Sequence, residues 1–310
     1  MITTVTLNPC NDKTVYISHF TYGGMNRVES QRFDIAGKGF NVARCVSRLG
    51  GQAVATGFLF KENGMMTQNV LEGEGVECDC LYCEGSVRCN TKIFDRSAKT
   101  ITEINEPGER VDETAQAALI ERIKAWATRS SMVVLSGSLP PNIGTDYYAT
   151  IIEQCQSLCP VVLDTEGEAL RRGIGKKPWM IKPNRYELEL LVDSPLPTLE
   201  FVKAAAQSIV REGVEIVAVS LGGEGALIAS AEGVYFSGPM DGVAVRGTVG
   251  AGDSMVAGIC LAKEQGLPVD QMLRWGVASA SSCVAQEGSG LAVKEQVDLL
   301  LPAVAVRKLN

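Results

Sequence analysis

The sequence predicts an α/β domain with a mostly parallel central sheet, and three observations support this. From about Val111 onward, short runs that are apolar on both faces alternate with amphipathic helical segments, as in parallel sheets covered by helices on both sides. The chain has 310 residues, of which 45% are hydrophobic, enough to bury one large core without disulfide bonds. Its 32 glycines and 6% aromatic residues favour tight turns and sites lined by backbone.

The first elements fit this class. Residues 1–8 have a strand pattern without a basic leader, so no secretory signal is expected. A helix should begin in the glycine-rich segment Ile35–Arg44, with Val42, Val46 and Leu49 on one face and Gly50 beyond its end.

Two polar segments interrupt the alternation and predict a small β-sheet lid. Residues 13–35 and 86–107 have no clear helical pattern, and Thr91–Asp95 and Thr100–Ile104 form a predicted hairpin around residues 96–99. An exposed lid sheet with an apolar face favours a homodimer formed through the lid. The expected division is a main domain of residues 1–12, 36–85 and 108–310, and a lid of residues 13–35 and 86–107.

In the second half, strands are expected over the apolar runs Met132–Leu135, Val161–Leu163 and Ile216–Leu221. Asp112 is the predicted N-cap of one intervening helix, and another should run from about Thr198 until Gly213 stops it. The apolar face predicted for that second helix consists of Phe201, Val202, Ala205, Ala206 and Ile209.

Composition excludes several function classes. The net charge of −7 argues against nucleic acid and acidic membranes as partners. His19 is the one histidine, so a histidine base or a histidine-rich metal site is disfavoured. No run of about 18 apolar residues predicts a membrane span. Ten cysteines without an export signal indicate reduced thiols and a cytoplasmic location.

Four of those cysteines lie close together in the sequence. Their spacing lacks the paired CxxC pattern of structural zinc sites, so small buried or half-buried thiols are the favoured interpretation. The four are Cys78, Cys80, Cys83 and Cys89.

The strongest chemical motif is the glycine-rich turn Thr248–Ser254, which precedes a helix of small residues, Met255–Ala262. The free amides and the dipole at a helix N-terminus suit an anion such as a phosphoryl group. The motif allows two interpretations of Asp253 in this turn. It is either an ordinary acid of a first helical turn or a base that takes a proton from an attacking hydroxyl.

Three further motifs each allow a structural and a functional reading. Gly37, Lys38, Gly39 and Asn41 begin a helix and could also bind a ligand, although neither a Walker A loop nor a dinucleotide fingerprint is present. Asn184 and Glu187 are one helical turn apart, which suits either a capping box or a magnesium ion that keeps its waters. The turn Ser220–Ala226 is either a plain hairpin or a floor for ribose and phosphates.

Together these motifs resemble the PfkB, or ribokinase-like, carbohydrate kinases along nearly the whole chain. The series consists of Thr6–Pro9 with Asp12, Gly37–Ala43, Ser136–Pro140, Lys182–Asn184 with Glu187, and Gly250–Asp253. The opening and Thr102–Ile104 are similar to the branch of 1-phosphofructokinases and tagatose-6-phosphate kinases. Cys10 and Asn11 in place of a small apolar pair, and Phe40 in place of Ile, depart from that branch.

The resemblance implies a three-layer α/β/α domain with a lid, and ATP- and magnesium-dependent phosphorylation of a sugar phosphate. Fructose 1-phosphate is the favoured substrate, with tagatose 6-phosphate, fructose 6-phosphate and a non-catalytic sugar-phosphate sensor as alternatives. Asp253 is the implied base, beside an anion hole of Gly250, Ala251 and Gly252. Implied nucleotide contacts are Lys182, Asn184, Ser220, Gly222, Gly223 and Gly225, and the implied magnesium ligands are Asn184 and Glu187. Implied sugar-phosphate contacts are Asp12, Gly37, Lys38, Asn41, Arg88, Asn90 and Ser138, with Lys92 near Arg88.

Overall fold

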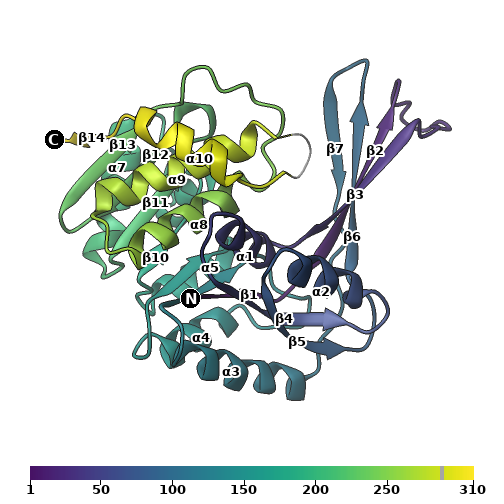
Figure 1. Cartoon of the computed structure of the whole chain (residues 1–310), viewed down its shortest axis with the longest axis horizontal. Helices are drawn as coiled ribbons and strands as arrows, with labels where there is room; N and C mark the ends of the chain where they lie inside the picture. The colour runs from purple at the N-terminus through teal and green to yellow at the C-terminus, as the bar shows by residue number, and fades with distance from the viewer. Residues whose placement is uncertain (287–289) are drawn as a thin grey trace.

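Two β-sheets of different size organise the chain in the computed structural model, which describes residues 1–286 and 290–310 (Figure 1). The larger sheet has the strand order β14-β13-β12-β11-β10-β9-β8-β1-β4-β5. Its strands from β11 to β5 are parallel to their neighbours, and β12, β13 and β14 are antiparallel additions at one edge. The predicted mostly parallel sheet is therefore confirmed. The strands are β1 (Ile2–Thr6), β4 (Ala53–Phe60), β5 (Glu77–Cys83), β8 (Met132–Ser136), β9 (Val161–Asp164), β10 (Met180–Ile181), β11 (Ile216–Ser220), β12 (Ala226–Ser230), β13 (Gly233–Ser237) and β14 (Arg307–Leu309).

Helices cover both faces of this sheet and give three layers. Helices α1, α8, α9 and α10 pack against one another, while α3 to α7 form a second series of neighbours. The central strands β1, β4 and β8 are buried along their whole length, as expected for strands covered on both faces. The helices are α1 (Lys38–Arg48), α2 (Gly64–Gly73), α3 (Glu113–Ala127), α4 (Tyr147–Cys155), α5 (Gly167–Ile174), α6 (Arg185–Val192), α7 (Leu199–Arg211), α8 (Ala251–Glu264), α9 (Val269–Val284) and α10 (Lys294–Leu300).

Local signals explain most of these boundaries. The Asp112 side chain accepts a hydrogen bond from the Ala115 amide and caps α3, and Gly213, with φ of +113°, follows the end of α7. The prediction that Phe201 belongs to the buried face of this helix is wrong. Phe201 is 54% exposed, because it lies at the margin of the α7 face that Val202 and Ala206 bury.

Helix α8 is the most deeply buried helix segment near the functional motifs, since every residue from Asp253 to Ala262 is buried. A Cβ atom at Gly258 would lie 2.6 Å from the Trp275 carbonyl oxygen of α9. The glycine therefore lets α8 and α9 approach closely, which fixes the N-terminus of α8 at the edge of the parallel strands.

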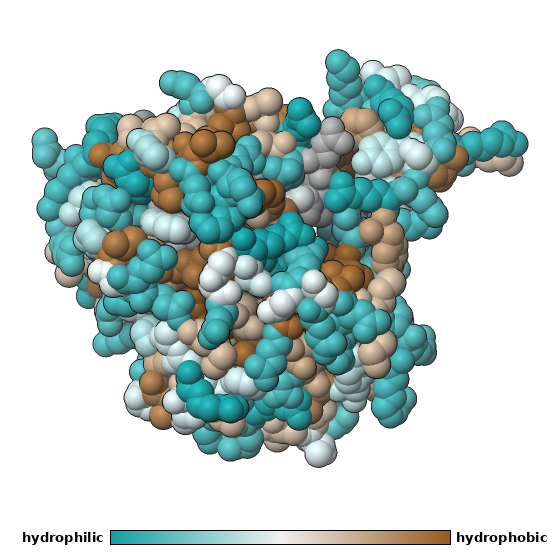
Figure 2. Space-filling model, viewed as in Figure 1, coloured by the Kyte–Doolittle hydropathy of each residue, from teal (hydrophilic) through white to brown (hydrophobic). Residues whose placement is uncertain are grey.

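The smaller sheet projects from the body as a separate lobe (Figures 1 and 2). Its strand order is β3-β2-β6-β7, with β2 parallel to β6 and the other pairs antiparallel. The predicted hairpin of residues 91–104 is confirmed by the pairing of β6 with β7. The strands are β2 (Cys10–Ile17), β3 (Ser30–Ala36), β6 (Arg88–Asp95) and β7 (Thr100–Ile104).

The helices of the described ranges, 1–286 and 290–310, include none that is long and apolar enough to cross a membrane.

Candidate active site

Two cavities meet at the carboxyl ends of the parallel strands, where open α/β sheets place their ligand crevices. A polar cavity of about 590 Å³ lies between the body and the smaller sheet. An apolar cavity of about 440 Å³ lies between the β11–β12 turn and helices α8 and α9. Ser220 and Gly252 line both, so the glycine turn before α8 is where the two cavities join.

Every residue that the sequence predicts for the site lines one of these cavities. Ser220 and Gly252 line both cavities. The predicted residues that line only the apolar cavity are Gly222, Gly223, Gly225 and Ala251. Those confined to the polar cavity are Asp12, Gly37, Lys38, Asn41, Arg88, Asn90, Ser138, Lys182, Asn184, Glu187, Gly250 and Asp253.

Asp253 lies at the floor of the polar cavity, in the first turn of α8. Gly250 takes the left-handed conformation, with φ of +85°, and begins the helix. The Asp253 side chain is only 6% exposed, and Asn41 Nδ2 donates a hydrogen bond of 2.8 Å to its Oδ2. Burial, and then the nearby Asp164 carboxylate, raise the pKa of Asp253 to about 6. The group is therefore a stronger base than an ordinary aspartate and is still mostly ionised at pH 7.

Asp164 is a functional candidate that the sequence reasoning missed. It ends β9, is fully buried, and lies 3.3 Å from Lys182 Nζ and 3.7 Å from Lys38 Nζ. Burial alone would raise the pKa of Asp164, but Lys182, Lys38 and hydrogen bonds hold it below its ordinary value. Asp164 therefore anchors two cations in the cavity. Its position at the carboxyl end of a predicted parallel strand is the signal that could have identified it.

Lys182 brings positive charge to the glycine turn. A Cβ atom at Gly252 would lie 3.4 Å from Lys182 Nζ, so the lysine ammonium group lies close to the backbone of the turn. The first amides of α8 have no intrahelical acceptor, and the Ala251 amide donates to the Thr248 carbonyl at 3.3 Å. The amides of Gly252 and Asp253, together with Lys182, therefore form an arrangement suited to an anionic group.

The smaller sheet contributes a buried ion pair to the opposite wall. Lys92 Nζ donates to Asp12 Oδ2 at 2.7 Å, and Asn90 Nδ2 lies 3.4 Å from Asp12 Oδ1. These three side chains are each at most 9% exposed, so their geometry is fixed by mutual contacts. Because Asp12 pairs with Asn90 in the β2–β6 register, all three project from one face of the sheet.

Arg88 connects the smaller sheet to the body. Its guanidinium donates to the Glu106 carbonyl at 2.6 Å and approaches Ser138 Oγ at 3.3 Å and the Asn8 carbonyl at 3.4 Å. Its Nε is buried and has no hydrogen-bond partner among the described residues. The guanidinium group thus lies at the wall of the polar cavity, where a positive charge with a planar set of donors suits a phosphate group.

Asn184 and Glu187 form the capping box that the sequence left as one of two readings. Asn184 Oδ1 accepts from the Glu187 amide, and Glu187 Oε2 accepts from the Asn184 amide, both at 2.8 Å. Glu187 also lines the polar cavity and is 9% exposed. Its carboxylate supplies oxygen ligands at the wall of this cavity, which fits a magnesium ion that keeps several waters. The Asn184 side chain primarily holds Glu187 in place.

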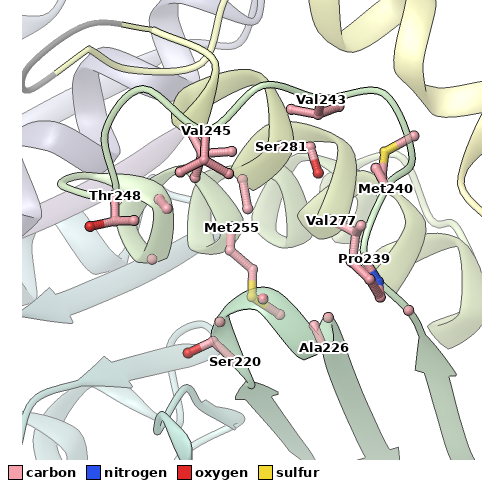
Figure 3. A pocket seen from close by; sticks show the side chains of 18 residues that line it. Ser220, Ala226, Pro239, Met240, Val243, Val245, Thr248, Met255, Val277 and Ser281 are labelled. Atoms are coloured by element: carbon pink, nitrogen blue, oxygen red, sulfur yellow. The ribbon is translucent and has the colours of Figure 1, made fainter.

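The apolar cavity is built largely from a loop and from α9, which the sequence motifs did not include, together with the first turns of α8. Figure 3 shows Val243 and Val245 on the loop above the cavity, Val277 and Ser281 on α9, and Met255 reaching from α8 toward the β11–β12 turn. That turn joins antiparallel strands, as the hairpin reading expects, and its glycines also line the cavity. The loop of residues 238–248 has no periodic pattern, so the sequence offered no sign of its role.

Cys10 and Phe40, which differ from the pattern of the 1-phosphofructokinase and tagatose-6-phosphate kinase branch, lie in different parts of the structure. Cys10 lines the polar cavity, and burial, then the Asp12 carboxylate, raise the pKa of its thiol to about 12. Phe40 is fully buried in the core and packs beneath Gly37. Cys10 therefore contacts the site directly, whereas Phe40 supports it from below.

Comparisons with known proteins agree with this geometry. The model of the pfkB family of carbohydrate kinases matches residues 5–296. The 1-phosphofructokinase of Bacillus subtilis is 36% identical over 310 residues, covering 100% of both chains. That of Haemophilus influenzae is 34% identical, covering 100% of this chain and 99% of its own.

A solved structure gives the same result for the fold. Phosphofructokinase-2 from Escherichia coli, in complex with substrates and products, superposes with a TM-score of 0.90 at 28% identity, covering 98% of this chain and 99% of that chain. This similarity confirms the ribokinase-like α/β fold that the motifs implied. The chain therefore belongs to the pfkB family of carbohydrate kinases.

Proposed function

We propose that this chain transfers the γ-phosphoryl group of ATP to fructose 1-phosphate and forms fructose 1,6-bisphosphate. One observation carries the proposal. The buried carboxylate of Asp253 lies at the helix N-terminus where a cavity rich in cations joins an apolar cavity. The full-length similarity to proteins named 1-phosphofructokinase supports this choice of sugar phosphate.

The polar cavity is assigned to the sugar phosphate. Arg88, with Lys38 across the cavity, provides the positive charge for the phosphate that the sugar already carries, because a guanidinium binds phosphate in a bidentate manner. Hydrogen-bonding groups around them are assigned to the sugar hydroxyls. They are Asp12, Gly37, Asn41, Asn90 and Ser138.

The apolar cavity is assigned to the base and ribose of ATP. Its aliphatic lining suits a flat ring, and the turn of Gly222, Gly223 and Gly225, with Ser220, offers backbone groups near the ribose. Since both cavities share Gly252, the phosphates of ATP pass over the glycine turn beside Lys182. The transferred phosphoryl group then lies between ATP and the sugar.

The chemical step requires no covalent bond between the protein and the substrates. Asp253 accepts the proton of the attacking sugar hydroxyl, and Asn41 holds its carboxylate through the 2.8 Å hydrogen bond. The amides of Gly252 and Asp253, together with Lys182, stabilise the negative charge on the transferred group. Positioning and charge neutralisation therefore supply most of the reduction in the barrier.

Magnesium fits this arrangement through Glu187. Its carboxylate lines the phosphate side of the polar cavity, and Asn184 keeps it oriented through the capping box. Bound there largely through water, the ion would neutralise phosphate charge on ATP. The ten free cysteines also favour the reducing cytoplasm as the place where the enzyme works.

A homodimer formed through the smaller sheet is part of the proposal. Phe33 is 49% exposed and Ile104 is 56% exposed, and the register places both on the sheet face opposite the polar cavity. An isolated four-stranded sheet with such a face gains stability by covering it. Light scattering should give a dimer at micromolar concentration, and Ile104→Glu should shift it toward monomer. The control Leu299→Glu changes a 78% exposed residue of the body and should leave the dimer intact. A monomeric wild type contradicts this part.

A coupled assay of ADP release tests the function itself. Fructose 1-phosphate, fructose 6-phosphate and tagatose 6-phosphate are compared at equal concentrations, and fructose 1-phosphate should give the highest kcat/KM. A higher value with either other sugar phosphate would replace the substrate but keep the chemistry. ADP release with none of the three, from protein shown to be folded, would favour a non-catalytic sensor instead.

A further inference from the structure

The four cysteines that are close in sequence do not form one cluster in space. Cys78 and Cys80 lie on one face of β5, Cys83 lies on the opposite face, and Cys89 lies on β6 in the smaller sheet. What remains is a pair. The Cys78 and Cys80 sulfur atoms are 3.8 Å apart, and both residues are half-buried.

This pair lies on an edge strand of the larger sheet, on a face that α2 covers. Among the strands of residues 1–286 and 290–310, β5 pairs only with β4, and no other strand of these ranges covers its outer edge. The same face of β5 carries Tyr82, whose hydroxyl is 2.6 Å from Gln68 Oε1 of α2. The two thiols therefore lie under the C-terminal part of α2, where Glu72 adds negative charge near Cys78.

The geometry favours a bridging atom over a disulfide bond. Residues two apart on a strand have Cα atoms about 6.6–6.8 Å apart, at the upper limit for a disulfide. Direct bonding would bring the sulfurs from 3.8 Å to about 2.05 Å. By contrast, two bonds of about 2.3 Å, the length of a Zn–S bond, span the present separation of 3.8 Å with a sulfur–centre–sulfur angle of about 110°. A centre with longer bonds to sulfur spans the same separation with a smaller angle, so neither sulfur has to move far.

We propose that Cys78 and Cys80 form a chelating dithiol site for a soft, thiophilic centre such as Cd²⁺ or a trivalent arsenical. With an arsenical R–As=O, two sulfur–arsenic bonds form and the arsenic–oxygen bonds break. The oxygen leaves as water with the two thiol protons, and nothing is oxidised or reduced. With Cd²⁺, two sulfur–metal bonds form and two protons are released to solvent.

The site has two protein ligands, because residues 1–286 and 290–310 contain no group of three or more His, Cys, Asp or Glu side chains placed to hold a metal ion. Its remaining coordination positions would be taken by water or small ligands. The two thiols line neither cavity of the active site, so the site is independent of the proposed kinase reaction.

Phenylarsine oxide is the first probe, applied to the reduced full-length chain under native conditions and followed by intact-protein mass spectrometry. We expect one adduct at one equivalent, stable to excess monothiol and removed by a dithiol such as 2,3-dimercaptopropanol. Cys78→Ser and Cys80→Ser should each retain the arsenical about 100-fold less well, because the second bond is then no longer intramolecular. Both variants should keep wild-type kinase turnover, which shows that they are folded.

Cys155→Ser is the matched control, because Cys155 and Cys159 form another pair that is close in sequence but buried. It should leave the adduct unchanged. The second experiment is a titration with Cd²⁺, which is followed by the ultraviolet band of sulfur-to-metal charge transfer. If this band appears in the wild type and is lost in Cys78→Ser, the site binds metal cations as well as metalloids. Failure of both probes to bind the wild type, or an adduct that survives in Cys78→Ser and Cys80→Ser, would overturn the proposal.

Discussion

The two cavities that meet at Gly252 recognise their ligands by opposite physical means. The polar cavity is lined by buried charges, among them Asp253, Asp164, Lys182 and Lys92. The apolar cavity is lined mainly by aliphatic side chains and glycine backbone, and none of the described residues that line it is acidic or basic. One side therefore selects charge and hydrogen bonding, and the other selects shape and apolar area.

This difference determines how precisely the side chains of each cavity must be positioned. A buried charged group must be paired or hydrogen-bonded, so the polar cavity holds Asp12 and Asp164 in ion pairs with lysines from other elements, and Asp253 by a hydrogen bond from Asn41. An aliphatic lining needs only the right volume. Substitutions in the polar cavity should therefore alter kcat or the KM for sugar, whereas substitutions in the apolar cavity should alter the KM for ATP.

The largest effect is expected for Asp253→Asn, which keeps the shape of the side chain and removes the base. Loss of a general base costs about 10²–10⁴ in rate. The loss should appear in kcat, with both KM values within a few-fold of wild type, because ground-state binding does not use the base. Steady-state kinetics with both substrates measures this.

Thermal unfolding of the same variant separates a catalytic role from a capping role. The folded-state pKa of Asp253 lies above its ordinary value. The ionised carboxylate therefore costs stability once the pH rises above about 6. Asp253→Asn should consequently unfold at the same or a higher temperature at pH 7. Near-wild-type kcat in this variant would reduce Asp253 to an ordinary first-turn residue.

The next effect concerns the phosphate of the sugar. Arg88→Ala removes a charge-assisted contact worth about 1.5–3 kcal/mol, so the KM for sugar phosphate should rise about ten- to a hundred-fold. The KM for ATP should change little. The matched control is Arg96→Ala on the same sheet, since Arg96 pairs with Glu29 and lines neither cavity. A raised KM for ATP with an unchanged KM for sugar would place Arg88 at the wrong end of the site.

A smaller effect is expected on the apolar side. Ser281 lines that cavity from α9, and Ser281→Phe would fill part of its volume (Figure 3). The KM for ATP should rise about tenfold, equivalent to about 1.4 kcal/mol, while the KM for sugar phosphate stays within twofold. Ser281→Ala leaves the volume free and is the control. Equal increases in both KM values would show that the cavities are not separate in function.

Sequence reasoning recovered the parts of the site that carry a local signature. The turn Gly250–Asp253 and the pair Asn184 and Glu187 are recognisable because glycine turns and capping boxes are written in neighbouring residues. The strand alternation predicted the parallel sheet for the same reason. Features that depend on a few adjacent residues are therefore accessible from one sequence.

Features that depend on residues distant in the sequence coming together in space were missed. Asp164 matters because Lys38 and Lys182 approach it from other elements, and its position at the end of a predicted strand does not by itself reveal these two partners. The loop carrying Val243 and Val245 became a cavity wall only through its position over α8 and α9. Phe201 was misplaced because helical spacing defines a face and leaves its margin undefined.

The pH dependence of kcat/KM tests the central claim, that Asp253 is the base of the polar cavity, most directly. Wild type and Asp253→Asn are compared from pH 5 to 8, so that the variant reports the titration of the substrate phosphates alone. With a pKa of about 6 for Asp253, wild-type kcat/KM relative to the variant should be about tenfold lower at pH 5 than at pH 7. The activity falls on the acid side because the base must be ionised. Parallel profiles for the two proteins across this range would contradict the assignment.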